Sequence, residues 1–351
     1  MSADPIAGLL LDAFRDVMCY PELRTDENLF EAGCTSRMAM EAMGRVRRHG
    51  ISVDLRDILE RPFVEQLARH AAEEVMFDGR MWAPFDLSGR FVPIKAHGTG
   101  QPLVVVHPAI GEPLSLWNLG VSDVPCPILG VRAVGLDPGE RPLAPMERIA
   151  SRYLADLAAA GIGHPHLLGG YSMGGLVALE MARQLVEAGQ PAKLLVIFDT
   201  VVPELRADHS RGLLDVDLAH VRRHRHDLLL GELRGRTGRD LPAGASYADI
   251  HEALRQEGVL EPATTLDRFI RIQEVWCHNT YSALRYACRP VPVDTVYFRG
   301  TRTGGSDLQR EYWAALQRGH ITFIDHAEDH DTLMRSRAVG RDVVELLARS
   351  S

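Results

Sequence analysis

The pentapeptide Gly170-Tyr171-Ser172-Met173-Gly174 has the residue types and spacing of a serine nucleophile on a tight turn. It follows the apolar run HLLGG and precedes the helical stretch GLVALEMARQL, which is the strand-to-helix context of a nucleophile elbow. Such a turn leaves no room for side chains two positions before and after the serine. A glycine-rich turn with a passive serine is the disfavoured alternative. We therefore predict that Ser172 is a catalytic nucleophile at the positive end of a helix dipole.

A serine hydroxyl needs a base to remove its proton, and His330 is the favoured candidate among 15 histidines. It lies in HAEDHDTLM, between the last predicted strand (HITFIDH) and the final helix, which places it above the carboxyl ends of the strands. His326 is the local rival, but it lies nearer the strand and is expected to point elsewhere. His220, His224 and His226 lie on a charged helical stretch and are expected to form a solvated face. No metal site is predicted.

Two aspartates compete for the role of the acid that orients the imidazole. Asp199 ends the predicted strand AKLLVIFD, whereas Asp307 follows the strand DTVYFRG within a TGGSD loop. We favour Asp199 because it caps a strand directly. An oxyanion hole is also required, and the Met173 amide is expected to supply one donor. The loop in VVVHPAIGEP is expected to supply the other, from Ala109 or, as the close alternative, from Ile110.

Short apolar runs alternate with helical stretches from residue 91 onward, which indicates a mostly parallel sheet with helices on both faces. A long, charged and largely helical insertion at about 203–290 breaks the alternation and is expected to form a lid. Six of its apolar residues either line a chamber or pack the lid itself. They are Leu228, Leu229, Leu230, Phe269, Val275 and Trp276. The six predicted strands are PLVVVHP, CPILGVRA, HLLGGYS, AKLLVIFD, DTVYFRG and HITFIDH.

The first 75 residues have a different pattern and predict a small all-α bundle of four helices. The second helix is expected to run from Ser36 to Gly50, and the other three fall near 6–17, 55–60 and 62–75. Residues 77–90 carry glycine and proline without periodicity and are interpreted as a linker, with a root-mean-square span of ~20 Å if flexible. The predicted division is therefore 1–76, 77–90 and 91–351.

The composition of this chain of 351 residues is that of a globular protein and excludes disordered, collagen-like and coiled-coil architectures. A formal net charge of −8 argues against nucleic acid as a main partner. Five cysteines without CxxC spacing favour reduced thiols and a cytoplasmic location. No stretch approaches the ~20 apolar residues of a membrane span, and the N-terminus lacks the basic region of a signal peptide. We expect no membrane partner and a monomer.

Residues 91–350 resemble the type I thioesterase domains of nonribosomal peptide synthetases and polyketide synthases, an α/β-hydrolase fold. The resemblance runs through VVVHPAIG, GGYSMGGLVALEMA, LLVIFDT and AEDHDTLM, in order and joined by the lid. In that family the acid follows the strand after the nucleophile helix, which supports Asp199 over Asp307.

Residues 5–75 resemble an acyl or peptidyl carrier domain through NLFEAGCTSRMAMEAM, which implies 4′-phosphopantetheine on Ser36. Thr35 and Arg37 depart from the family pattern at the positions beside that serine. A helix N-terminus suits a phosphate, although a plain N-cap is the alternative role for Ser36.

Together the two resemblances imply release of an acyl or peptidyl chain from a carrier thioester through an acyl-serine, by hydrolysis or by transfer to a hydroxyl or amine. An editing thioesterase that clears mis-primed carriers, with Asp307 as its acid, is one alternative, and a non-catalytic carrier or docking module is another. The chain starts with methionine and shows no adenylation or condensation domain. We therefore expect a phosphopantetheinyl transferase and an upstream synthetase or ligase as partners, although an excised fragment of a larger synthetase stays open.

Overall fold

The computed structural model divides the chain into two compact units, Met1–Met81 and Trp82–Ser351. Each unit has its own hydrophobic core. The linker predicted at 77–90 lies outside the described residues except for Arg90. The described residues are 3–47, 53, 55–75, 90–95, 98–116, 119, 124–202, 217–260, 264–303, 306–334 and 336–350.

The N-terminal unit is helical. Its described helices are α1 (Ala3–Met18), α2 (Ser36–Arg47), α3 (Leu55–Glu60) and α4 (Val64–Val75). Helix α1 packs against both α2 and α4, because its apolar residues recur at helical spacing and bury one face. Residues 48–50, at the predicted end of the second helix, lie outside the described part. The core of the unit contains Leu10, Phe14, Leu23, Leu29, Val46, Ile58, Val64 and Leu67.

The larger unit is built on a seven-stranded sheet in the order β1-β3-β2-β4-β5-β6-β7. Only β1 is antiparallel to its neighbour; the other adjacent pairs are parallel. The strands are β1 (Phe91–Lys95), β2 (Leu103–Val106), β3 (Ile128–Val131), β4 (Leu167–Tyr171), β5 (Leu194–Phe198), β6 (Thr295–Gly300) and β7 (Ile321–His326). The six predicted strands are present, and β1 is an additional edge strand.

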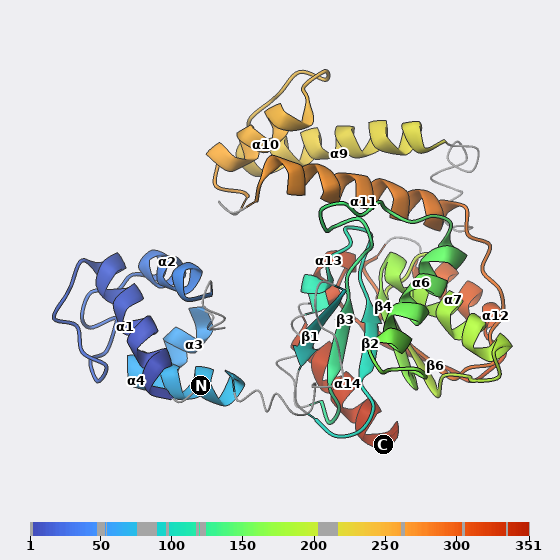
Figure 1. The fold of residues 1–351 in the computed structure, drawn as a ribbon, viewed down its shortest axis with the longest axis horizontal. Helices are drawn as coiled ribbons and strands as arrows, with labels where there is room; N and C mark the ends of the chain where they lie inside the picture. Colours follow the sequence, from blue (N-terminus) through green and yellow to red (C-terminus); the bar gives the residue numbers. More distant parts are fainter. Residues whose placement is uncertain are drawn as a thin grey trace. The chain divides into compact units, whose positions relative to one another are not determined.

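Helices cover both faces of this sheet (Figure 1). Successive strand residues alternate between two cores: Val104 and Val106 contribute to one, Leu103 and Val105 to the other. Helices α6 (Met146–Ala159), α7 (Met173–Glu187) and α12 (Ser306–Leu316) contribute to the first core, and α14 (Arg337–Ser350) to the second. This is the expected α/β architecture, and it brings the carboxyl ends of six parallel strands to one edge.

The lid between β5 and β6 is helical, with α9 (Leu218–Thr237), α10 (Tyr247–Gln256) and α11 (Leu266–Leu284). The part of the predicted lid at 203–216 lies outside the described residues. Leu229, Leu230 and Phe269 belong to a core shared by the three helices. Trp276 also packs within this segment, in a cluster that contains Val221, Cys277 and Leu284. Val275 packs against Ala133 and Leu136 of the body, while Leu228 is exposed.

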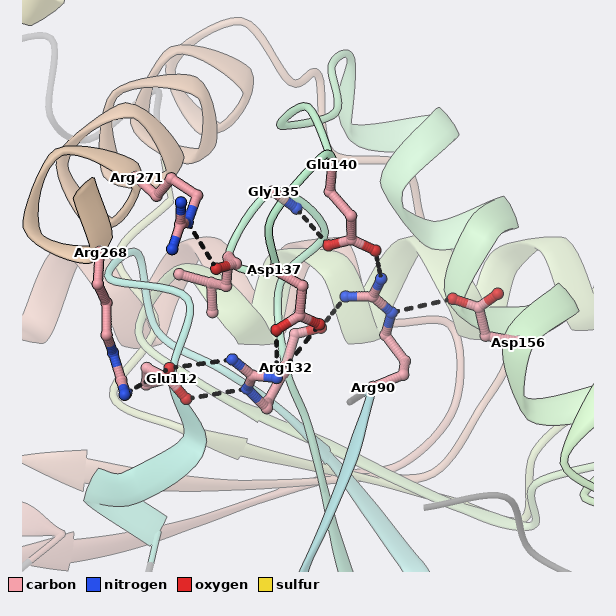
Figure 2. A network of polar contacts seen from close by, with 10 residues as sticks. Arg90, Glu112, Arg132, Gly135, Asp137, Glu140, Asp156, Arg268 and Arg271 are labelled. Carbon is pink, nitrogen blue, oxygen red and sulfur yellow. Dashed lines mark hydrogen bonds and ion pairs between the residues drawn. The ribbon is translucent and has the colours of Figure 1, made fainter. Parts of the chain in front are cut away.

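Arg90 corrects one predicted boundary. We expected it to end the linker, but its side chain is buried and joins the larger unit (Figure 2). It donates to Asp156 at 3.1 Å and to the Arg132 carbonyl at 3.1 Å, and it pairs with Glu140. A buried guanidinium needs such partners, so the folded unit begins no later than Arg90.

Among the described helices, none is both long and apolar enough to span a bilayer.

Candidate active site

Ser172 stands between the last residue of β4 and the first residue of α7, with φ 57° and ψ −127°. Non-glycine residues rarely adopt a positive φ, so the surrounding structure must enforce it. The Ser172 amide donates to the Phe198 carbonyl at 3.0 Å. A side chain at Gly170 would overlap the Gly174 carbonyl, and one at Gly174 would overlap the end of β2. The glycines on both sides therefore permit the strained turn.

The hydroxyl of Ser172 is not used for local capping. Although Ser172 occupies the N-cap position of α7, its side chain makes no capping hydrogen bond. Its Oγ lies 3.0 Å from Nε2 of His330 instead. The hydroxyl is thus directed at an imidazole rather than at its own helix.

His330 begins the short helix α13 (His330–Leu333), directly after the loop that follows β7. Asp329 caps this helix, and a reciprocal capping box joins Asp329 to Thr332. The ring of Tyr171 stacks on the imidazole with 5.1 Å between centroids, and its hydroxyl donates to the His330 carbonyl at 2.6 Å. The backbone and the ring of His330 are therefore both held in place.

Asp199 directly follows β5 and is 3% exposed. Its Oδ2 lies 2.8 Å from Nδ1 of His330 and also accepts from the Thr303 hydroxyl at 2.8 Å. Its Oδ1 accepts from the Gly300 amide at 3.0 Å. A carboxylate only accepts, so Nδ1 carries the proton and Nε2 is left to accept from Ser172. The structure thus brings Ser172, His330 and Asp199 into one hydrogen-bonded chain.

The two rival residues lie elsewhere. The side chain of Asp307 is 93% exposed, and its Oδ1 pairs with Arg299 at 2.7 Å. His326 stacks on Phe298, and its Nε2 lies 3.2 Å from a carboxylate oxygen of Asp342. The structure does not bring either residue to Ser172.

The two amides expected to face an oxyanion are those of Met173 and Ala109. Met173 begins α7, so its N–H has no acceptor within that helix. Within the described residues, neither amide donates a hydrogen bond. Ala109 and the alternative residue Ile110 are the central residues of a turn closed by the Gly111 amide donating to the Pro108 carbonyl at 2.9 Å. Ile110 is 42% exposed.

His107 precedes this turn and is fully buried. Burial lowers the pKa of His107 to about 4, so the imidazole is neutral at physiological pH. Its Nε2 accepts from the Tyr153 hydroxyl at 2.6 Å, and its Nδ1 donates to the Pro108 carbonyl at 2.8 Å. Burial raises the pKa of Tyr153, which keeps that hydroxyl a donor. His107 therefore links the core to the turn.

The backbone beside Asp199 is held by a second buried tyrosine. Burial, together with the nearby Asp199 carboxylate, raises the pKa of Tyr297 well above its ordinary value. Its hydroxyl donates to the Thr200 carbonyl at 2.9 Å, and the Trp313 indole donates to the same oxygen at 3.0 Å.

The N-terminus of α2 carries the residue expected to hold phosphopantetheine. Thr35 caps this helix, since its hydroxyl oxygen accepts from the Met38 amide at 3.3 Å. The N-cap role is therefore taken by Thr35, and Ser36 is the first helical residue. No acidic residue lies in the first turn, so the helix end suits a phosphate. The chemistry of this position fits the cofactor that the resemblance implies.

Two residues that support the site, Tyr171 and Thr303, are not among those predicted from the sequence. Tyr171 lies inside the pentapeptide Gly170–Gly174, so its position beside Ser172 was a usable signal. Thr303 lies in the loop after β6, where a single threonine gives no local sign that it contacts Asp199. In the described part of the chain, no group of three or more His, Cys, Asp and Glu side chains is arranged to hold a metal ion.

Two family models match the chain. The phosphopantetheine attachment site matches residues 8–71, and the thioesterase domain matches residues 101–236. These ranges include Ser36 and Ser172, respectively.

Several curated proteins match nearly the whole chain. A probable non-canonical nonribosomal peptide synthetase of Salinispora arenicola is 26% identical over 95% of this chain and 4% of its own length. An atromentin synthetase of Paxillus involutus is 26% identical over 94% of this chain and 35% of its own length. A second protein of that fungus with the same identity and coverage is named an inactive atromentin synthetase. The chain thus spans about a third or less of these relatives.

Solved structures share the fold. A four-domain nonribosomal peptide synthetase aligns with a TM-score of 0.62 and 18% identity, covering 98% of this chain and 26% of its own. The Vlm2 thioesterase domain aligns with a TM-score of 0.54 and 24% identity, covering 74% of this chain and 97% of its own.

Proposed function

We propose that this chain, a carrier–thioesterase didomain similar to nonribosomal peptide synthetases, releases an acyl or peptidyl chain from a thioester on its own carrier domain. The observation that carries the proposal is the hydrogen-bonded chain from Ser172 Oγ through His330 to Asp199. Such a chain converts a weak hydroxyl nucleophile into one that attacks a thioester carbonyl.

The proposed acylation step uses these three residues. Ser172 Oγ attacks the thioester carbonyl carbon while His330 Nε2 takes its proton. The carbonyl electrons move onto oxygen, and the amides of Met173 and Ala109 donate to that oxyanion. Each such donor is worth ~10²–10³ in rate. When the intermediate collapses, the carbon–sulfur bond breaks, His330 returns the proton to sulfur, and the acyl group remains on Ser172.

Deacylation uses the same residues. His330 Nε2 removes a proton from water, a hydroxyl or an amine, whose oxygen or nitrogen then attacks the ester carbonyl. Ser172 leaves with the proton, and the product is an acid, an ester or an amide. Asp199 stabilises the positive charge that the imidazole carries in both half-reactions.

The carrier domain supplies the substrate. When bound to Ser36, 4′-phosphopantetheine provides the thiol that holds the chain as a thioester. Ser36 is the residue that would carry it, and the amides at the start of α2 would face its phosphate. Since both domains belong to one chain, the first step is intramolecular, at an effective concentration in the ~mM range. A phosphopantetheinyl transferase and an upstream loading enzyme complete the scheme.

Two alternatives make different predictions. An editing thioesterase was expected to use Asp307, but the exposed position of this residue and its pairing with Arg299 do not favour that reading. A non-catalytic module would leave Ser172 inert, and the relative named inactive makes this alternative worth testing.

A serine-directed fluorophosphonate distinguishes the proposal from an inert module. We expect stoichiometric labelling of Ser172 in the full chain, with no labelling of Ser172→Ala. We also expect turnover of hexanoyl-N-acetylcysteamine, a soluble thioester, by the wild-type chain alone. An unlabelled wild-type chain without thioester turnover would contradict the proposal. Product masses from the native loaded chain then separate hydrolysis from cyclisation or transfer.

A further inference from the structure

The turn that contains Ala109 is held at several of its peptide groups. The Gly111 amide and Nδ1 of His107 both donate to the Pro108 carbonyl, and the Ala133 amide donates to the Gly111 carbonyl at 2.9 Å. These contacts come from the turn itself, from His107 and from the loop after β3. A further hydrogen bond comes from the lid helix α11.

That contact is made by Asn279, a residue of α11 that is 3% exposed. Its Nδ2 donates to the carbonyl oxygen of Ala109 at 2.9 Å. A carbonyl only accepts, so the amide nitrogen of Asn279 must face it. A buried carboxamide hydrogen-bonded to the backbone of the turn is a costly arrangement unless both groups stay paired.

Two more residues of the same helix face contact this turn and the residue that follows it. A Cβ atom at Gly111, where φ is 89°, would lie 2.7 Å from Cγ1 of Val275. Nη2 of Arg268 lies 3.4 Å from Oε1 of Glu112. Positions 268, 275 and 279 share one face because they are separated by about two turns and one turn of helix. One face of helix α11 therefore contacts Ala109, Gly111 and Glu112.

Glu112 extends this contact into the body of the protein (Figure 2). Its carboxylate also accepts from Arg132, which in turn pairs with Asp137 at 3.1 Å. Nearby on α11, Nε of Arg271 donates to the Leu136 carbonyl at 3.0 Å. The lid helix is thus bonded to the loops after both β2 and β3, beside the proposed oxyanion site.

We propose that Asn279 is a positioning residue, through which lid helix α11 holds the Ala109 turn in the geometry that its amide needs to receive the oxyanion. The proposal rests on the function proposed above. Asn279 bonds the carbonyl of Ala109, and within the described residues the amide of Ala109 donates no hydrogen bond. Fixing the carbonyl restrains the peptide group between Ala109 and Ile110, so the turn cannot rotate without breaking a buried hydrogen bond.

The test compares three variants of the full chain acting on hexanoyl-N-acetylcysteamine. Asn279→Leu removes the donor, and Asn279→Asp replaces it with an acceptor of the same shape. Gln273→Leu is the matched control, because it removes a buried carboxamide from α11 that bonds Arg225 and the Phe269 carbonyl within the lid. Turnover is expressed per serine labelled by fluorophosphonate at its end point, so that misfolded protein does not count.

We expect both Asn279 variants to lose about 10- to 100-fold in kcat per labelled serine, because an oxyanion donor acts in the transition state. KM and the pH profile of kcat/KM are expected to stay close to wild type, since none of the described hydrogen bonds of His330 and Asp199 involves Asn279. The Gln273→Leu chain is expected to keep the wild-type kcat per labelled serine.

Wild-type kcat in Asn279→Leu, or an equal loss in Gln273→Leu, would overturn the positioning role while leaving the proposed function intact. Failure of the proposed function has a separate signature, since the wild-type chain would then neither be labelled nor turn over the thioester.

Discussion

At the scale of single residues, the structure separates the two aspartates that compete for the role of orienting His330. Asp199 receives hydrogen bonds from His330, Thr303 and the Gly300 amide, whereas the Asp307 side chain faces solvent and pairs with Arg299. An asparagine at 199 would offer fewer acceptors to three donors and would no longer hold the proton on Nδ1.

We therefore predict that Asp199→Asn lowers kcat/KM for the soluble thioester by about 10³–10⁴-fold, whereas Asp307→Asn stays near wild type. Steady-state kinetics of both purified variants measures this. Intact turnover in Asp199→Asn together with its loss in Asp307→Asn would reverse the assignment and favour an editing role.

A second residue-scale prediction concerns His107. In the unfolded chain its pKa takes the ordinary value of 6.5, and in the folded protein burial lowers the pKa to about 4. Between pH 4 and pH 6.5 only the unfolded chain binds the proton. The contribution of neutral His107 to the free energy of unfolding is therefore present in full above pH 6.5 and is lost as the pH falls toward 4. The loss from pH 7 to pH 5 is about 2 kcal/mol for this group.

Chemical denaturation at these two pH values tests this effect in wild type and His107→Gln. The free energy of unfolding is expected to fall more in wild type than in the variant, because the acidic groups common to both cancel in the comparison. An equal fall in the free energy of unfolding of the two proteins would show that the pKa of His107 does not differ between the folded and the unfolded chain.

At the scale of elements, the elbow between β4 and α7 is the feature on which the site depends most. A methyl group at Gly170 meets the backbone of Gly174, which cannot rotate away as a flexible side chain would. We predict that Gly170→Ala lowers the free energy of unfolding by about 1–3 kcal/mol, through overpacking. Chemical denaturation measures the change.

Gly231→Ala is the matched control, because Gly231 lies within α9 and its added methyl group meets nothing within 4 Å. It is expected to raise the free energy of unfolding by about 0.5–1 kcal/mol, through helix propensity. Similar effects of the two substitutions would mean that the elbow is not tightly packed.

Elements also differ in how far the sequence could predict them. Six strands, the elbow and the positions of Ser172 and His330 depend on local patterns of apolar and glycine residues. Strand β1 was missed because FVPIK is short, contains Pro93 and pairs antiparallel at an edge, where alternation is weak. Arg90 and Asn279 could not be recognised, since their partners lie far away in the sequence and only the folded chain brings them together.

At the scale of the whole molecule, we propose that two domains on one chain perform separate steps. Ser36 is predicted to receive the chain and Ser172 to release it. Ser36→Ala is therefore expected to keep wild-type turnover of hexanoyl-N-acetylcysteamine while abolishing release of a carrier-loaded chain. Parallel assays with the soluble thioester and with the loading enzyme measure the two activities. A loss on both substrates would contradict this division.

Transfer of an acyl group from Ser36 to Ser172 tests the central claim most directly. The full chain is loaded with hexanoyl-phosphopantetheine by a broad-specificity transferase, quenched in acid at short times and digested for peptide mass spectrometry. We expect hexanoyl mass on the Ser172 peptide of wild type, and its retention on the Ser36 peptide in Ser172→Ala. Release of free hexanoate by Ser172→Ala at the wild-type rate would contradict this expectation.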